Sequence, residues 1–517
     1  MEPTKSKTTK SRWLKTMRKY HKWPGIVITI FILFFATSGI ILNHRDWFSS
    51  VDINRSYLPP DYRLTNWNLA SIKGAVHLTT SDMVVYGNIG AWLTNNKMEY
   101  FIDLNDGFPK GIDSRKVEAM LYTDDGILLA GTLFGLYLFN GEFWDKIEIP
   151  TSEKRITDLI ERQNQIHILT RSHLLITDDL KSFEIITLPE YADDDNKVSL
   201  FRTLWTLHSG EMFGEWGKIV VDILGLGLIF LGVSGILHWL FPKWVKRRKR
   251  KNGSIQSLKS GMKTNLKWHN KIGYILAFFL IFTTITGMFL RPPLLIPIAQ
   301  SRVAKIPFSK LDNPNPWYDK LRRIAWDDLN NKYLVSTSEG FFHFDANFSE
   351  SANYIHPQPP VSIMGCTVLE PYTAIPGVWL VGSFSGLFQW DMQSNTIQNV
   401  ITRRPVMSTA RMGPPISSNL ISGYIRTNRA EYLVEYSRGM EVLSGHAVSV
   451  PSMPAGIKDA TPFSLWNLAL EVHTGRIFNH LIGSWYILYI PLAGITLLIV
   501  IISGFVIWWL AHRKKRK

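Results

Sequence analysis

The sequence has a single cysteine, Cys366, among its 517 residues, and it has neither a CxxC pair nor a glycine-rich nucleotide fingerprint after a strand. One cysteine cannot form an internal disulfide, so the parts of the chain outside a membrane must depend on ordinary hydrophobic cores. A flavin or nicotinamide site would need such a fingerprint in a sizeable domain. The longest basic connector is too short to provide that domain, so these cofactors are excluded.

Acidic residues are almost absent from three strongly basic segments, 1–22, 243–271 and 513–517. These segments contain 24 of the 57 Lys and Arg residues and one acid, Glu2, while the remainder has 33 basic and 41 acidic residues. The net charge of +15 therefore comes from short segments that flank hydrophobic runs. Such a bias marks the cytoplasmic side of a membrane protein and does not indicate a nucleic-acid partner.

Four hydrophobic windows are long enough to span a bilayer, at 24–43, 219–241, 272–290 and 481–510. The first has no small-residue cleavage site, so we interpret it as a spanning helix and not as a signal peptide. We expect a multi-pass protein of a bacterial cytoplasmic membrane with both termini in the cytoplasm. The expected divisions are a basic N-terminus (1–22), spans at 23–44, 208–242, 269–291 and 470–512, extracytoplasmic segments at 45–205 and 292–465, a basic loop (243–268) and a cytoplasmic tail (513–517).

Four histidines stand at matching places before these hydrophobic runs, and each run ends in Ser-Gly or Thr-Gly. The histidines and closing glycines are His21 with Gly39, His208 with Gly235, His269 with Gly287, and His473 with Gly504. The first and third pairs share a spacing of 18 residues. The chain therefore reads as an internal duplication of two-helix halves, which predicts a four-helix transmembrane bundle with parallel repeats.

The two outer segments contain a finer repeat. LLAGTLFGLYLFNG at 128–141, YLVSTSEGFFHFDA at 333–346 and WLVGSFSGLFQWDM at 379–392 each join an apolar strand to an alternating aromatic strand through a glycine turn. Weaker copies occur at 83–103, 166–180 and 432–445. Three units per half predict a large all-β domain, and we favour one six-bladed propeller built from both halves. Two separate β-rich domains are the alternative.

The matched histidines predict two ligand pairs at different depths. A helix of 18 residues is about 27 Å long, close to the hydrocarbon thickness. His21 and His269 lie beside the basic segments and are expected at the cytoplasmic side, and His208 and His473 at the outer side. Paired imidazoles between helices are a familiar way to hold haem iron. His44 is the alternative outer ligand, and single interfacial histidines are more often simply solvated.

Two other features have structural interpretations that compete with functional ones. The Ser/Thr-Gly pairs are by themselves more typical of helix packing than of cofactor contacts. Asp222 is the only carboxylate inside the second hydrophobic window. It would either bond a neighbouring helix or accept a proton, and the packing role is favoured.

The segments HKWPG…TSGIILNH, LHSGEMFG…SGILHW, HNKIG…TGMFL and VHTGRIF…SGFVIWW resemble the PepSY-associated transmembrane helix family. Members of that family include inner-membrane proteins tied to iron uptake and ferric-siderophore reductases with two b-type haems. The resemblance implies two haem b groups whose iron ligands are His21, His269, His208 and His473. It covers the four helices, while the outer segments depart from the family pattern.

These observations together predict a di-haem membrane protein that passes electrons outward to a ferric chelate, such as a siderophore, in iron acquisition. Its electron donor would be a separate molecule, either a quinol or a soluble reductase. The alternative is a non-enzymatic accessory or sensor protein whose β-domain binds an envelope partner. A transporter is less consistent with the pattern, because the spans lack the interruptions of a broken-helix site.

Overall fold

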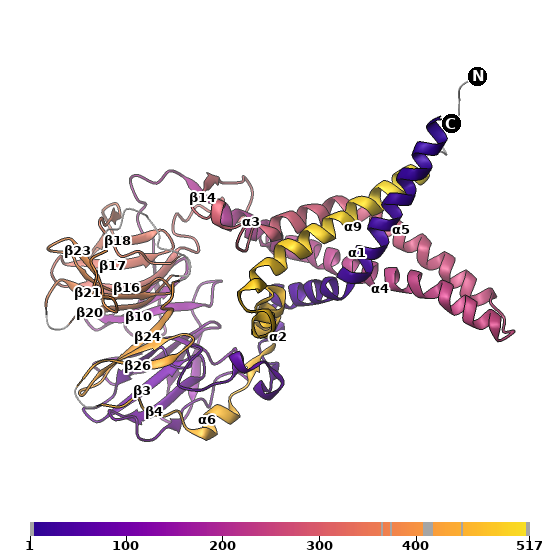
Figure 1. Cartoon of the computed structure of the whole chain (residues 1–517). Coiled ribbons are helices and arrows are strands. Elements are labelled where there is room, and N and C mark those ends of the chain that lie inside the picture. Colours follow the sequence, from indigo (N-terminus) through magenta and orange to yellow (C-terminus); the bar gives the residue numbers. More distant parts are fainter. Residues whose placement is uncertain (1–4, 363–364, 373–374, 407–416, 446–447, 513–517) are drawn as a thin grey trace. The chain divides into compact units, whose positions relative to one another are not determined.

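The computed structural model describes residues 5–362, 365–372, 375–406, 417–445 and 448–512. The chain divides into two compact units. One contains the segments up to residue 48, 196–312 and from 465 onward, and the other contains 49–195 and 313–464 (Figure 1). The expected tail 513–517 and residues 1–4 lie outside the described residues.

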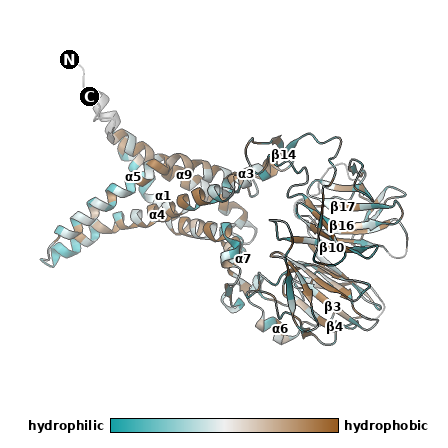
Figure 2. Ribbon diagram, turned by 180° about the vertical axis from the view of Figure 1, so that it is seen from behind, coloured by the Kyte–Doolittle hydropathy of each residue, from teal (hydrophilic) through white to brown (hydrophobic). Residues whose placement is uncertain are grey.

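The first unit contains four long helices that are able to span a membrane. They are α1 (Lys5–Asn43), α4 (Gly214–Arg250), α5 (Gln256–Met288) and α9 (Tyr489–His512). The spans that are long and apolar enough are Arg12–Asn43, Glu211–Arg250, Gln256–Met288 and Arg476–Ala511. Hydrophobic residues cover the middle of these helices in Figure 2, and large apolar side chains such as Phe278 are exposed along them. The prediction of four apolar helices is confirmed.

The long helices contact one another in a cyclic order, since α1 and α5 each pack against both α4 and α9. Two short helices precede the second and fourth long helices. These are α3 (Leu200–Ser209), which contacts α5, and α7 (Leu465–His473), which contacts α1. The unit also contains α2 (Arg45–Phe48), α8 (Asn479–Ile482) and a small sheet of β14 (Lys197–Ser199) and β15 (Arg302–Ala304).

Helix boundaries near the histidines differ from those expected. His208 and His473 do not open long helices but lie at the ends of α3 and α7. The chain turns immediately afterwards at Gly210 and Gly475, whose φ angles are +80° and +74°. Glycine adopts this left-handed conformation without steric penalty. His21 and His269 lie inside α1 and α5, because both helices extend into the basic segments.

The second unit is built from six antiparallel meanders. Five have four strands and the sixth has three in the described residues. Their strands are β2 (Gly74–His77), β3 (Asp82–Gly87), β4 (Gly90–Asn95), β5 (Ile102–Asp103); β6 (Val117–Tyr122), β7 (Leu128–Thr132), β8 (Leu136–Phe139), β9 (Trp144–Ile147); β10 (Ile156–Arg162), β11 (Gln165–Thr170), β12 (Leu174–Thr177), β13 (Glu184–Ile186); β16 (Leu321–Asp327), β17 (Lys332–Thr337), β18 (Gly340–Asp345), β19 (Asn353–Tyr354); β20 (Cys366–Pro371), β21 (Val378–Ser383), β22 (Gly386–Asp391), β23 (Thr396–Asn399); β24 (Ile421–Arg426), β25 (Glu431–Glu435), β26 (Gly439–Ser444). Helix α6 (Ala455–Ala460) and the pair β1 (Asp52–Ile53) with β27 (Phe463–Ser464) complete the unit.

Each sequence repeat of the outer segments corresponds to the second and third strands of one meander. The first strands contact one another in the cyclic order β2, β6, β10, β16, β20, β24 and again β2. Six apolar cores lie between neighbouring sheets, and one of them joins the first sheet to the last through Val85 and Val434. Both outer segments therefore share one all-β unit, which argues against two separate domains. Residues 196–205 and 292–312, expected in the outer segments, belong to the helical unit.

A buried histidine makes the stability of the β-unit dependent on pH. His167 is 1% exposed, and its Nε2 lies 2.7 Å from the Tyr333 hydroxyl of the neighbouring sheet. Burial lowers the pKa of His167 to about 4, from an ordinary value of 6.5. Below pH 6.5 the unfolded chain binds a proton that the folded chain excludes, so stability falls as the pH drops.

As the pH falls from 6.5 to 4, we expect His167 to lower the free energy of unfolding by up to about 3 kcal/mol, since each unit of pKa difference is worth 1.36 kcal/mol. Denaturant unfolding of the full chain, followed by tryptophan fluorescence, should show the loss. The His167→Gln variant should be less stable at pH 7 but depend less on pH over this range. An unchanged pH dependence in the variant would contradict this role of His167.

Candidate functional site

The four matched histidines meet as two pairs in the helical unit. The His208 and His473 rings, at the ends of α3 and α7, have centroids 6.2 Å apart. The His21 and His269 rings, on α1 and α5, have centroids 6.1 Å apart. These are the two pairs that the sequence pattern predicted. Their ligation of a metal stays a prediction.

Each ring rests on the closing glycine of a third helix. A Cβ atom built on these glycines would lie close to the imidazole Cε1 atom. The distances are 2.6 Å from Gly287 to His208, 2.8 Å from Gly504 to His21, 3.5 Å from Gly39 to His473 and 3.6 Å from Gly235 to His269. The glycines of the Ser/Thr-Gly pairs therefore provide room for the imidazoles, a role beyond the helix packing favoured from the sequence.

The residues around each glycine also bind the imidazole Nδ1 atom. At the His208–His473 pair, His473 Nδ1 lies 2.9 Å from Ser38 Oγ, and His208 Nδ1 lies 2.9 Å from the Thr283 carbonyl oxygen. At the other pair, His269 Nδ1 lies 2.8 Å from Ser234 Oγ, and His21 Nδ1 lies 2.9 Å from the Val500 carbonyl oxygen. Each partner lies one residue (serine) or four residues (carbonyl) before the glycine.

These contacts determine which ring nitrogen carries the hydrogen. A carbonyl oxygen only accepts, so His21 and His208 donate through Nδ1–H. Ser38 donates its own hydroxyl hydrogen to Phe34 O at 2.6 Å, and Ser234 donates to Leu231 O at 3.2 Å. Both serines are then acceptors for the histidines. All four imidazoles keep the Nε2 lone pair, which is the form that ligates a metal.

The spacing of the two pairs fits an iron between their rings. Metal–nitrogen bonds of about 2.0 Å on opposite sides of one ion place the ring centroids roughly 6 Å apart. Among the described residues no group of three or more His, Cys, Asp or Glu side chains is able to hold a metal ion. Two imidazoles with free Nε2 lone pairs are the donor set of a bis-histidine haem, whose macrocycle supplies the other four nitrogen ligands.

His44, the alternative outer ligand, has a different environment. Its Nε2 atom lies 2.5 Å from Asp222 Oδ2, and its ring stacks on Trp47 with centroids 4.0 Å apart. Asn43 Nδ2 donates to the other Asp222 oxygen at 3.2 Å. Asp222 thus bonds a neighbouring helix end, as the favoured interpretation held, and it occupies the nitrogen that His44 would offer to an iron.

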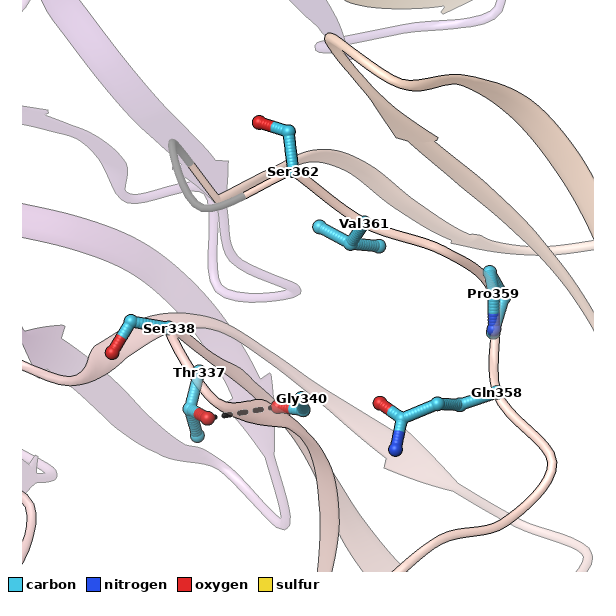
Figure 3. A pocket seen from close by; sticks show the side chains of 7 residues that line it. All are labelled: Thr337, Ser338, Gly340, Gln358, Pro359, Val361 and Ser362. Carbon is cyan, nitrogen blue, oxygen red and sulfur yellow. Dashed lines mark hydrogen bonds between the residues drawn. The ribbon is translucent and has the colours of Figure 1, made fainter. Parts of the chain in front are cut away.

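A small pocket of the β-unit offers no comparable chemistry. It is lined by Thr337, Ser338, Gly340, Gln358, Pro359, Val361 and Ser362 (Figure 3). The Gln358 side chain accepts from Phe341 N at 2.7 Å and donates to Ile355 O at 2.8 Å. The pocket lining contains neither a charged group nor a histidine, so the paired histidines are the better candidate site.

The chain belongs to the PepSY-associated TM region family, whose model matches residues 2–241 and again residues 243–511. It is therefore a membrane protein of that family. No curated protein matches the chain.

Several solved structures resemble the chain distantly. The extracellular domain of the putative hybrid two component system BT4673 from B. thetaiotaomicron is 12% identical, with a TM-score of 0.34 over 72% of this chain and 32% of its own. The chain thus spans about a third of that domain. YCF48 bound to D1 peptide is 8% identical (TM-score 0.30; 75% and 96% covered), and Saccharomyces cerevisiae Sqt1 is 10% identical (TM-score 0.27; 74% and 98% covered).

Proposed function

We propose that this protein is a di-haem b membrane electron-transfer protein that reduces an extracytoplasmic ferric chelate. The observation that supports this most directly is the pair of imidazole sites, each with its Nδ1 atoms bonded and its Nε2 lone pairs available. His208 and His473 would hold one haem, and His21 and His269 the other. When bound, the haem irons supply one-electron redox chemistry.

The two sites are separated by most of the apolar length of the helices. His21 and the glycine that contacts His473 are both on α1, 18 residues apart. The same spacing separates His269 from the glycine that contacts His208. At 1.5 Å per residue the separation is about 27 Å, so one site lies near each surface of a bilayer. This arrangement supports electron passage from one side of the membrane to the other.

The remaining parts have roles that follow from this arrangement. The six meanders are the blades of one propeller, and with the helices they are the product of a duplication, which agrees with the repeated family match. The donor is a quinol or a soluble reductase on the cytoplasmic side. The acceptor is Fe(III) held by hard oxygen ligands, such as a siderophore, which release the metal more readily as Fe(II).

The proposed topology predicts a clear reporter pattern. A reporter active only outside the cytoplasm should give a signal when fused at residue 150 or 400, and none at 255 or 517, because the basic segments stay in the cytoplasm. Each fusion should also be tested with a reporter active only in the cytoplasm, which should give the reverse pattern. Activity of the external reporter at 255 would reverse the assignment of the two histidine pairs to the two surfaces.

Chelate reduction is tested on the purified full chain. The protein is reduced with a stoichiometric amount of dithionite and mixed anaerobically with a ferric hydroxamate chelate. We expect the haem bands to return to the oxidised form while a ferrous-specific dye captures the released iron. The His208→Ala variant should transfer few electrons. A haem-containing wild-type protein that stays reduced in the presence of ferric chelates would contradict the proposed substrate.

A further inference from the structure

The residues that flank the His208–His473 pair differ between its two sides, although the histidines and their glycine contacts are matched. We call these two sides the edges of the pair. The duplication places Asn43 and Arg291 at equivalent positions, four residues after the closing glycines of α1 and α5. It likewise matches Glu211 with Arg476, each three residues after an outer histidine. One edge is thus amide and acid, with Asp222 bonded to Asn43, and the other edge has two arginines.

Arg291 and Arg476 both have the Glu471 carboxylate as a neighbour. Arg291, Arg476 and Glu471 lie within electrostatic range of one another, and the charge of Arg291 also acts on His473. Arg476 donates through Nη2 to Glu471. Two partly buried guanidiniums beside one carboxylate favour the binding of a further anion.

Buried polar atoms at this edge have unmet hydrogen-bonding capacity. In the part of the chain that the structure describes, Arg476 Nε and the Tyr489 hydroxyl are buried without a hydrogen-bond partner. A Cβ on Gly475, the residue before Arg476, would lie 2.2 Å from the Tyr489 ring, so this ring packs against the backbone next to Arg476. A buried donor left unsatisfied costs free energy, and an anionic oxygen would remove that cost.

An aromatic surface lies between this polar edge and the histidine. The Tyr489 and Phe35 rings have centroids 5.1 Å apart, and Phe35 meets His473 edge-on at 5.6 Å. The region thus combines an apolar wall, an iron-ligand candidate and a cationic edge. A flat apolar molecule that carries carboxylates at one side matches this distribution, and haem b is such a molecule.

We propose that Arg291 and Arg476 bind the propionate carboxylates of the haem held by His208 and His473, and so fix the orientation of its macrocycle. This inference depends on the proposed function. The propionates point toward α5 and α7 because the opposite edge already holds the Asp222 carboxylate. The arginines act as positioning residues, and they raise the midpoint potential of the outer haem, since a nearby cation favours the reduced and more negative form.

The test compares wild-type protein with Arg291→Gln, Arg476→Gln and the double variant. Lys218→Gln is the matched control, because Lys218 is also near the outer helix ends but pairs with Glu215 at 3.0 Å. Haem loss to excess apomyoglobin and the midpoint potential are measured for each. In the double variant we expect one haem to leave roughly tenfold faster or more, as for loss of charge-assisted hydrogen bonds, and the other to leave at the wild-type rate. The faster-leaving haem should also have a lower potential.

Reconstitution with the dimethyl ester of haem, which has no carboxylates, provides the decisive comparison. The difference between wild-type protein and the double variant should disappear with the ester. If the wild-type protein holds two haems and the double variant has the same haem-loss rates and midpoint potentials, this inference is overturned but the proposed function is not. The double variant could instead keep both haems as firmly as the wild type but no longer be reoxidised by a ferric chelate. This result would mean that the arginines bind the chelate, and it would also overturn the inference. Wild-type protein without haem would overturn both this inference and the proposed function.

Discussion

His473→Ala and His208→Ala should each lose the same one of two haems, and His21→Ala and His269→Ala the other. Each substitution removes one of the two axial ligands of an iron, which leaves the macrocycle weakly held. We expect haem content to fall from two towards one per chain in every single variant. The residual spectra should be identical within each pair of variants and different between the pairs. Pyridine haemochrome assays and reduced-minus-oxidised spectra measure both quantities.

His44→Ala is the matched control for this series. It removes a histidine at the outer helix ends whose Nε2 atom is occupied by Asp222. We expect this variant to keep both haems, with some loss of stability because the Asp222 carboxylate loses one of its two partners and keeps only Asn43. Loss of a haem in His44→Ala, together with retention in His208→Ala or His473→Ala, would show that the pairing is wrong.

Alanine at the four closing glycines should separate them into two classes. At Gly287 and Gly504 the added methyl group would lie 2.6 and 2.8 Å from the imidazole Cε1 atom, well inside van der Waals contact. The Nδ1 atoms of His208 and His21 also donate hydrogen bonds to backbone carbonyl oxygens, so these rings cannot move away without losing a hydrogen bond. Overpacking of this kind costs about 1–3 kcal/mol. We expect Gly287→Ala to lose most of the haem proposed at His208 and His473, and Gly504→Ala most of the haem proposed at His21 and His269.

Gly39→Ala and Gly235→Ala are the matched controls, because they make the same substitution at the other two closing glycines. Their methyl groups would lie 3.5 and 3.6 Å from the facing rings, which is ordinary contact. Both variants should keep two haems, and their spectra should match the wild type. Equal haem loss in all four variants would mean that the glycines serve helix packing in general and have no specific relation to the imidazoles.

The sequence contained enough information to predict the helices, the outer sheets and the histidine pairs. Hydrophobic runs and flanking basic residues predicted the spanning helices, because lipid imposes a length requirement that sequence composition reveals. The aromatic repeats predicted all six meanders, since each repeat is one strand–turn–strand unit. The histidine pairs followed from the matching positions of the four histidines before the hydrophobic runs of the two halves.

Other features depended on geometry that spacing does not reveal. Helices α3 and α7 end at His208 and His473 because Gly210 and Gly475 adopt positive φ angles, and nothing in the apolar pattern marks that break. The contact of His44 with Asp222 joins residues separated by 178 positions. Hydropathy could not predict that His44 turns toward a carboxylate.

The role of the Ser/Thr-Gly pairs was only half visible in the sequence. The available signal was the shared spacing of 18 residues between a histidine and the closing glycine of the same helix. In the structure, however, each of these glycines contacts a histidine of a different helix. Sequence spacing relates residues on one helix, whereas each histidine bonds to another helix, either to the serine of the pair or to a carbonyl oxygen four residues before the glycine. The side-chain and carbonyl contacts of Nδ1 therefore required the three-dimensional structure.

The absorption spectrum of the purified full-length protein, oxidised and then reduced with dithionite, tests the central claim most directly. The account predicts Soret and α bands of six-coordinate, bis-histidine b-type haem, with a haemochrome content of two haems per chain. Both haems should be reducible, and carbon monoxide should leave the reduced spectrum nearly unchanged because no axial position is open. A haem-free protein from haem-replete cells would contradict the account and favour an accessory or sensor protein.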